Sequence, residues 1–90
     1  MEITWDDRKE LANLKKHGVA FDEAATVVLS PLALVAMNAH PSNNRWEYLG
    51  YSVKGRVLYV VTVEKADEFI KIISARKALP HEKERYEKRV

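Results

Sequence analysis

Two adjacent cations, Arg76 and Lys77, directly follow an apolar run that contains Ile72 and Ile73. Metal-free cleavage of RNA needs cations that stabilise the crowded phosphorane, a base for the 2′-hydroxyl and an acid for the leaving 5′-oxygen. The chain carries side chains for these roles, namely Arg76, Lys77, Glu47, Glu64, His17, His40 and Tyr86. Nearly any basic domain carries such a set. The residue types alone therefore leave a solvated strand end and a phosphate site equally open.

A second polar group lies on the first predicted helix, at spacings that place its members on one side. Its members are Lys9, Asn13, Lys16 and His17. Two lysines, an amide and an imidazole in line are suited to contacting phosphates, with Leu11 and Leu14 on the opposite, apolar side. The alternative is an ordinary solvent-exposed face in which His17 interacts with the negative end of the helix dipole.

Other kinds of chemistry lack their residues. The chain has no cysteine, which excludes a disulfide framework, a thiolate nucleophile and a cysteine zinc site. Its three histidines fall in three separate predicted elements without helical i,i+4 spacing, so we expect no metal site. The three glycines form no phosphate-binding loop, and no serine has a nucleophile-elbow pattern around it.

Composition predicts one domain spanning residues 1–90, because 47% of the residues are hydrophobic and can fill a single core. No apolar run approaches 18 residues and no signal peptide is recognisable, so we expect no membrane association and a cytoplasmic location. From residue 76 onward six Lys/Arg stand against three Glu, a net charge of +3. The first 75 residues hold nine cations and ten anions, so the positive potential is concentrated near the C-terminus.

The order of predicted elements is that of an α+β fold, an antiparallel sheet of about four strands with two N-terminal helices and a C-terminal helix. Asp6 is expected to cap the first helix and Gly18 to end it, whereas Ala20 offers no cap to the second. Residues 2–5 form a short edge strand or an extended segment. Helices are predicted over 7–17, over 21–30 and from 80 onward, and strands over 32–39, 45–53, 56–64 and 69–75.

Two-residue turns at 54–55 and 66–67 would fix the register of the last three strands. One face of the sheet would then carry a polar patch away from the first turn, while the other face, almost wholly apolar, would lie under the helices. The patch comprises Arg45, Glu47, Thr62, Glu64 and Lys71. A three-residue second turn would move Lys71 off it.

Three stretches resemble the motifs of a known family. "WDDRKELANLKKHGVAFDEA" is similar to the opening motif of the BrnT family, ribonuclease toxins of type II toxin–antitoxin modules. "RWEYLGYSVKGRVLYVV" resembles the family's central motif, and "IISARKA" followed by Glu82 and Tyr86 resembles its ending. The resemblance covers nearly the whole chain, in order and with matching spacing.

The resemblance implies a RelE-like fold and a metal-independent endoribonuclease that inhibits translation and uses no cofactor. It also implies neutralisation by a cognate, BrnA-like DNA-binding antitoxin, through which the toxin reaches operator DNA indirectly. The catalytic residues expected on this interpretation are Arg76, His40, Glu64, Lys65 and Arg45. The RNA-binding residues expected are Lys9, Asn13, Lys16, His17, Lys77 and Tyr86. A cross-strand ion pair with Arg45 explains Glu64 equally well.

The chain departs from the family pattern at Ala20, which replaces a Ser or Thr cap, and at Asn43 and Asn44, where glutamate is common. Lys65 replaces an arginine and so lacks the planar fork that suits a phosphate. These departures keep an alternative open, a catalytically weak or inactive toxin fold that pairs with the antitoxin for operon repression. Nucleic-acid binding without cleavage and gyrase inhibition are further alternatives.

Overall fold

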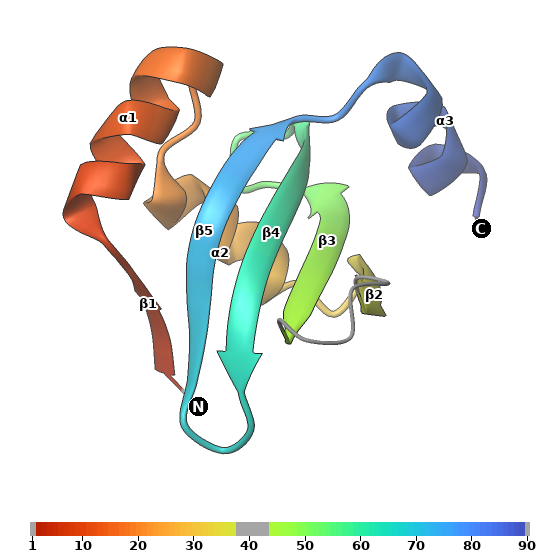
Figure 1. The fold of residues 1–90 in the computed structure, drawn as a ribbon. Helices are drawn as coiled ribbons and strands as arrows, with labels where there is room; N and C mark the ends of the chain where they lie inside the picture. Colours follow the sequence, from red (N-terminus) through yellow and green to blue (C-terminus); the bar gives the residue numbers. More distant parts are fainter. Residues whose placement is uncertain (1, 38–43, 90) are drawn as a thin grey trace.

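The structure is a computed structural model that describes residues 2–37 and 44–89. In chain order the elements are β1 (Glu2–Trp5), α1 (Asp7–His17), α2 (Phe21–Val28), β2 (Leu34–Met37), β3 (Arg45–Tyr51), β4 (Val57–Lys65), β5 (Phe69–Lys77) and α3 (Pro80–Lys88) (Figure 1). The α+β class and the three helices agree with the sequence-based expectation. His40 and Asn43 lie outside the described residues.

The sheet has five strands in the order β1-β5-β4-β3-β2. Four of them form the expected antiparallel arrangement, but β1 adds a fifth strand that pairs parallel with β5, so the prediction of an antiparallel sheet of about four strands is only roughly correct. Residues 2–5 are therefore a true edge strand. Parallel pairing is possible because α1, α2 and three strands separate β1 from β5 along the chain.

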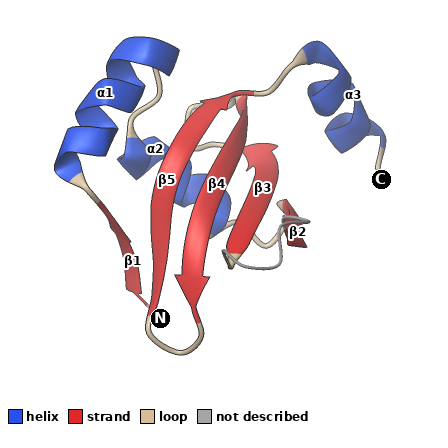
Figure 2. Ribbon diagram, viewed as in Figure 1, coloured by secondary structure: helices blue, strands red, loops and turns tan. Residues whose placement is uncertain are grey.

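The main core lies between one face of the sheet and helix α2, and α1 packs beside it along β5 (Figures 1 and 2). Phe21, Ala24 and Val27, spaced i, i+3 and i+6 on α2, are fully buried and pack over Val60 and Ile72 of the central strands. Helix α3 lies on the other side and covers only one end of the second face, where Tyr86 packs with Leu49 and Val57. No helix of the described residues covers the rest of that second face.

Both hairpin turns contain three residues where two were expected. Tyr51 pairs with Val57, Ser52 and Gly55 are joined by a turn hydrogen bond of 2.9 Å, and Gly55 adopts φ +79°. This is a type I turn followed by a left-handed residue, a common three-residue connection. The second turn also has three residues, between Lys65 and Phe69, but its left-handed residue is the central one, Asp67 at φ 63°. Each extra residue shifts the register by one, so the predicted pairings are wrong.

A β-bulge in β5 shifts the register once more. Thr62 pairs with Ile72 but Val61 pairs with Ser74, which leaves Ile73 as the extra residue. A bulge reverses the face to which all later side chains point. Arg76 therefore pairs with Tyr59 and lies on the face not covered by α2; without the bulge Lys77 would lie there.

We call this second face the open face. By register and alternation it carries Leu34, Ala36, Arg45, Glu47, Leu49, Tyr59, Val61, Val63, Lys71, Ser74 and Arg76. Three members of the predicted polar patch, Arg45, Glu47 and Lys71, share it. Thr62 and Glu64 lie on the opposite face, so their predicted place in the patch is wrong. Lys71 remains on the same face as Arg45, because each turn has one residue more than predicted and the two one-residue shifts in register cancel.

Helix α1 begins and ends as expected, since Asp6 accepts hydrogen bonds from the amides of Arg8 and Lys9 and Gly18 ends the helix at φ 70°. Its apolar side was predicted wrongly. Leu11 and Leu14 are 58% and 44% exposed, and the inward positions are occupied by polar residues.

Asn13 is the buried residue of α1. Its amide nitrogen donates to the carbonyl oxygens of Val19 (2.9 Å) and Ala75 (2.8 Å), and its oxygen accepts from the Ala75 amide (3.2 Å). The last pair between β1 and β5 is Trp5 with Ile72. Beyond it, the Asn13 side chain bonds to the backbone of Ala75 as a neighbouring strand would. This satisfies backbone groups that would otherwise be buried without partners.

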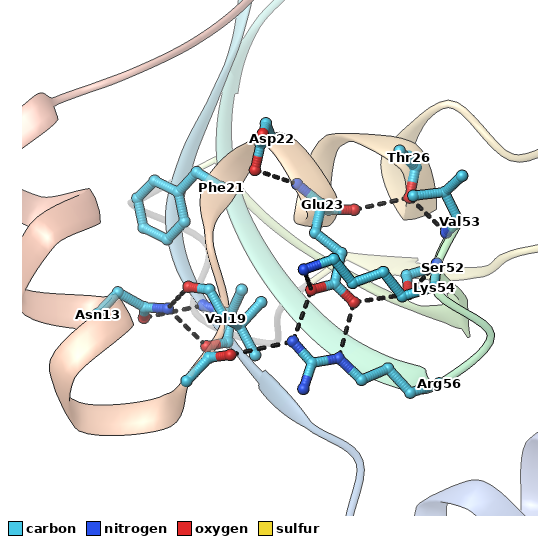
Figure 3. A network of polar contacts seen from close by, with 12 residues as sticks. Asn13, Val19, Phe21, Asp22, Glu23, Thr26, Ser52, Val53, Lys54 and Arg56 are labelled. Carbon is cyan, nitrogen blue, oxygen red and sulfur yellow. Dashed lines mark hydrogen bonds and ion pairs between the residues drawn. The ribbon is translucent and has the colours of Figure 1, made fainter.

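A buried ion pair joins α2 to the β3–β4 hairpin (Figure 3). The Glu23 side chain, 1% exposed, accepts from Arg56 Nε (2.8 Å), Arg56 Nη2 (2.6 Å) and the Ser52 hydroxyl (2.6 Å). Arg56 also donates to the Gly18 carbonyl oxygen at 3.0 Å. Hydrogen bonds from Arg56 hold the pKa of Glu23 below its usual value, against the opposing effect of burial. Glu23 is thus held as a carboxylate.

Candidate functional site on the open face

Arg76 lies on the open face near the end of β5 and is the cation with the most contacts described there. Its guanidinium lies over the ring of Tyr59, its cross-strand partner, with 4.3 Å between the guanidinium carbon and the ring centroid. Such a stack holds the planar group in one orientation and is favourable in itself. The side chain is 29% exposed, so it remains accessible from solvent.

Helix α3 supplies the partner of Arg76. Glu82 accepts from Arg76 Nη1 at 2.8 Å and from Nη2 at 3.0 Å, a bidentate pair. The same carboxylate accepts from the Leu79 amide at 2.8 Å, because Pro80 begins the helix and places Glu82 in its first turn. The Arg76 hydrogen bonds lower the pKa of Glu82, and Glu82 in turn raises the pKa of Arg76.

These contacts leave one edge of the guanidinium available. A guanidinium has five N–H groups: two on each terminal nitrogen and one on Nε. Glu82 takes one hydrogen of each terminal nitrogen, and the Lys77 carbonyl oxygen accepts from Nη1 at 3.2 Å. Among the described residues, nothing accepts from Nε or from the second hydrogen of Nη2. Those two form a fork with the spacing of two oxygens of a phosphate.

Beneath Arg76, Tyr59 connects the guanidinium to a second carboxylate. Burial, and then a hydrogen bond to Glu47, raise the pKa of Tyr59 to about 12. The hydroxyl therefore stays protonated at neutral pH and donates to Glu47. The open face thus combines a cation and a carboxylate, bridged by one aromatic ring.

Two more cations lie further along the open face. Arg45, Val63 and Lys71 pair across three neighbouring strands, so the two cations flank one valine. Val63 is four residues from Tyr59 on β4, about 13 Å at the usual ~3.3 Å per residue. Arg45 and Arg76 are therefore spaced to contact different phosphates of one strand.

The other predicted catalytic residues are not beside Arg76. Glu64 lies on the opposite face, where it accepts from the Tyr48 hydroxyl at 2.5 Å and from the Thr62 hydroxyl at 2.9 Å. Burial raises the pKa of Tyr48 above its usual value. Lys65 is at the far end of β4 in an exposed ion pair with Glu68 at 3.3 Å. His40 cannot be placed, because it lies outside the described residues.

The predicted RNA-binding residues are dispersed. Lys9 and Lys16 are exposed on α1, His17 is half-buried there, and Lys77 is exposed at the end of β5. Two others are occupied within the protein: Asn13 by Ala75 and Val19, and Tyr86 through its hydroxyl, which donates to the Leu32 carbonyl oxygen at 3.1 Å. Contact of these six residues with RNA stays a prediction.

The sequence did not indicate site roles for three residues of this surface. Glu82 and Tyr59 contact Arg76, and Arg85 lies on the surface beside them. Glu82 had a signal, since an acid two residues after Pro80 marks the first turn of a helix. Tyr59 had none, because its pairing with Arg76 depends on the bulge at Ile73.

Within the described part of the chain, no three His, Cys, Asp or Glu side chains gather closely enough to hold a metal ion. In the same residues, none of the three helices is both long and apolar enough to cross a membrane.

Comparison with known proteins places the chain among toxins. A family model described as "Ribonuclease toxin, BrnT, of type II toxin-antitoxin system" matches residues 5–82. The chain belongs to the BrnT family. The crystal structure of the Brucella abortus ribonuclease toxin BrnT is similar to it, with a TM-score of 0.72 and 25% sequence identity over 88% of this chain and 97% of that one. No curated protein sequence matches the chain.

Membership of the BrnT family makes this chain a ribonuclease toxin of a type II toxin–antitoxin system, and such a system implies a cognate antitoxin. The matched region begins at Trp5, which packs edge-on against Phe21, and ends at Glu82. It therefore includes strands β2 to β5 and the Arg76–Glu82 pair, but only the last residue of β1.

Proposed function

We propose that this BrnT-family toxin is an endoribonuclease that cleaves RNA on the open face of its sheet without a resident metal ion. A BrnA-like antitoxin neutralises it and connects it to operator DNA. The observation that carries the proposal is the Arg76 guanidinium, held by Glu82 and Tyr59 with its Nε–Nη2 fork unoccupied among the described residues. A ribonuclease needs such a preorganised cation where charge develops on the phosphate.

In this mechanism the 2′-oxygen of the RNA attacks the adjacent phosphorus and the bond to the 5′-oxygen breaks. The products are a 2′,3′-cyclic phosphate and a free 5′-hydroxyl. Arg76 binds two phosphate oxygens and stabilises the phosphorane. His40, in the segment between β2 and β3, takes the 2′-proton or supplies one to the leaving 5′-oxygen, and a water molecule carries out the other proton transfer. Glu64 is disfavoured for this role because it lies on the opposite face, bonded to Tyr48.

The remaining cations would guide the RNA. Arg45 and Lys71 lie on the same face as Arg76 and would contact phosphates further along the strand. Other basic side chains would add electrostatic attraction for the RNA that weakens as the salt concentration is raised. They are Lys65, Lys77, Lys9, Lys16 and His17. Among these cations and within the described residues, Arg76 is held by a bidentate carboxylate and an aromatic ring, whereas Lys65 has an exposed ion pair with Glu68.

Cleavage of a labelled RNA by purified protein in excess EDTA tests the proposal. Arg76→Ala should lower the cleavage rate by about 10²–10³-fold, the usual cost of losing one charge-stabilising donor. Arg76→Lys should recover little, since lysine lacks the fork. Glu84→Gln is the matched control, because Glu84 is exposed on α3 and accepts a hydrogen bond from the exposed Lys88. Equal rates for the wild type and Arg76→Ala would refute the assignment.

A second candidate function, a catalytically weak module that only pairs with antitoxin, is favoured by one observation. Arg76 already has a carboxylate partner, and a bound carboxylate competes with phosphate. If the wild-type protein leaves RNA intact with and without EDTA, yet binds the antitoxin encoded beside it, this second function replaces the first.

A further inference from the structure

The bulge in β5 brings three hydrogen-bond donors onto the open face. Lys71 lies on that face before the bulge, and Ser74 and Arg76 lie on it after the bulge. A regular strand would instead place Ile73 and Ala75 on the same face as Lys71. Because the bulge reverses the alternation, a hydroxyl and a guanidinium take the place of two apolar side chains, in line with the Lys71 ammonium.

The three donors are evenly spaced along the strand. In the register of the sheet they stand opposite Tyr59, Val61 and Val63 of β4, which are two residues apart from one another. Neighbouring donors are therefore about 7 Å apart, at the usual ~3.3 Å per residue. This spacing is close to the step between neighbouring phosphates in the extended backbone of a single strand. The row thus matches three consecutive phosphates.

Ser74 and Lys71 are accessible and can bind a ligand. Both are half-buried, and neither donates a side-chain hydrogen bond to another of the described residues. An acid near Lys71 is Asp6, whose pKa is lowered by hydrogen bonds from the amides of Lys9 and Arg8 and more weakly by the charge of Lys71. Asp6 is exposed and bonded to the start of α1, so it lies near Lys71 without forming an ion pair with it.

An apolar strip on β4 runs beside the three donors. Val61 and Val63 are half-buried, and Figure 1 shows α3 near one end of the sheet, away from the middle of β4. On the other side of the strip β3 carries Glu47, which pairs with Val61 and whose charge repels phosphates toward β5. Unpaired bases can lay their faces on such a strip, whereas the bases of a duplex are stacked on one another. The surface therefore suits a single strand.

We propose that β5 is a phosphate track, in which Arg76, Ser74 and Lys71 bind three consecutive phosphates of a single RNA strand whose unpaired bases lie over Val61 and Val63. The inference rests on the proposed function, because it takes the phosphate at Arg76 as the one that is cleaved. It adds a substrate class, single-stranded RNA, and a recognition site two phosphates away from the cleaved bond.

Binding of a 2′-O-methyl RNA hexamer, which cannot be cleaved, tests the phosphate track. Fluorescence anisotropy gives the affinity at several salt concentrations. Each cation–phosphate contact with a single strand adds about 0.7 to the slope of log affinity against log salt, so Lys71→Ala should make the slope shallower by about 0.7. Ser74→Ala should weaken binding about three- to tenfold at an unchanged slope, because a hydroxyl releases no counterion. The hexamer paired with its complement should bind at least about tenfold more weakly.

Lys88→Ala is the matched control for binding, because it removes an exposed lysine of α3 and should leave the slope unchanged. Melting temperatures of all variants verify that they are folded. An unchanged slope for Lys71→Ala, full affinity for Ser74→Ala, or equal binding of single strand and duplex overturns the inference.

A cleavage experiment locates the track relative to the cut bond. The substrate is a 2′-O-methyl RNA strand with one unmodified ribonucleotide, so that only one phosphate can be cleaved. Making the second linkage from that phosphate an uncharged methylphosphonate should slow the wild type about tenfold on one side of the cut and not on the other. Lys71→Ala should not respond to that replacement, because the two changes remove the same contact.

The two experiments separate the track from the cleavage mechanism. If neither side is sensitive, or if Lys71→Ala loses as much again on the modified substrate, the track is wrong while the ribonuclease mechanism stands. If the substrate stays intact but the binding slopes change as expected, the proposed mechanism fails and the track stands.

Discussion

Replacing Arg56 by methionine tests the stabilising role of the buried Glu23–Arg56 pair. The change keeps most of the aliphatic side chain but removes all three hydrogen bonds that Arg56 donates to Glu23 and Gly18. The Glu23 carboxylate would then be buried with the Ser52 hydroxyl at 2.6 Å and the Lys54 ammonium at 4.0 Å as its remaining polar partners in the ion-pair network.

Removing one partner of a buried ion pair costs ~3–5 kcal/mol, mainly because the other charge is left uncompensated. Since Ser52 and Lys54 still contact Glu23, we expect the lower end, about 3 kcal/mol. For a domain of this size, each kcal/mol shifts Tm by about 4–8 °C. Arg56→Met should therefore melt about 12–24 °C below the wild type at pH 7.

The pH dependence provides an independent check. In the wild type the pKa of Glu23 lies below its ordinary value of 4.5, so the pair stabilises the fold fully above that pH. This stabilisation is lost as pH falls through the lowered pKa of the folded state. In Arg56→Met, burial without the guanidinium raises the pKa of Glu23, so protonation relieves the buried charge. The difference in Tm between the two proteins should therefore be smaller at pH 4 than at pH 7.

Thermal melts followed by circular dichroism at both pH values measure these effects. Lys88→Met is the matched control, because it breaks an ion pair of similar length whose side chains are 74% and 63% exposed. We expect that change to cost no more than about 0.5 kcal/mol. If Arg56→Met melts within about 4 °C of the wild type, or if its deficit does not shrink at pH 4, the reasoning is wrong.

Three further substitutions have defined outcomes. Ala20→Ser should stabilise the fold by about 0.5–1 kcal/mol, because the present cap residue makes no side-chain bond to α2; a melt without any gain contradicts this. Asn13→Ala should destabilise by about 3 kcal/mol in urea unfolding, since three buried hydrogen bonds are lost; a variant of normal stability that no longer binds RNA would instead support its predicted RNA contact. Glu82→Gln should slow RNA cleavage about tenfold because Arg76 loses its charged support, whereas faster cleavage would show that Glu82 competes with the phosphate.

The elements of the fold could be predicted from the sequence because their signals are local. Asp6 and Gly18 delimit α1, and Pro80 begins α3, each for reasons contained within a few residues. The parallel pairing of β1 was not predictable, because four residues carry too little pattern to specify a partner 67 positions away.

Register was the point at which the sequence was insufficient. Lys54–Gly55 fits a two-residue turn, yet Gly55 occupies the left-handed position of a three-residue turn, and the spacing of these residues does not distinguish the two. The bulge at Ile73 has no sequence signal at all. Because it reverses alternation, it alone decides that Arg76 and not Lys77 lies on the open face.

The candidate site was therefore only partly predictable. The cation pair was placed correctly at the end of β5, but the carboxylate partner of Arg76 comes from α3 and its aromatic support from β4. Asn13 shows the opposite error: a polar residue at helical spacing looks solvent-exposed, but this one is 8% exposed because its amide replaces a strand.

The hydrogen bonds between Asn13 and Ala75 span 62 positions of the chain, and this separation constrains how the toxin is made. During translation α1 and β1 are synthesised first, but their strand partner β5 is among the last segments to be added. Contacts between such distant residues form late and slow the folding reaction. A growing chain therefore has no docked α1 and no Arg76 site until β5 and the first turn of α3 exist. An incomplete toxin, released early from the ribosome, should be inactive.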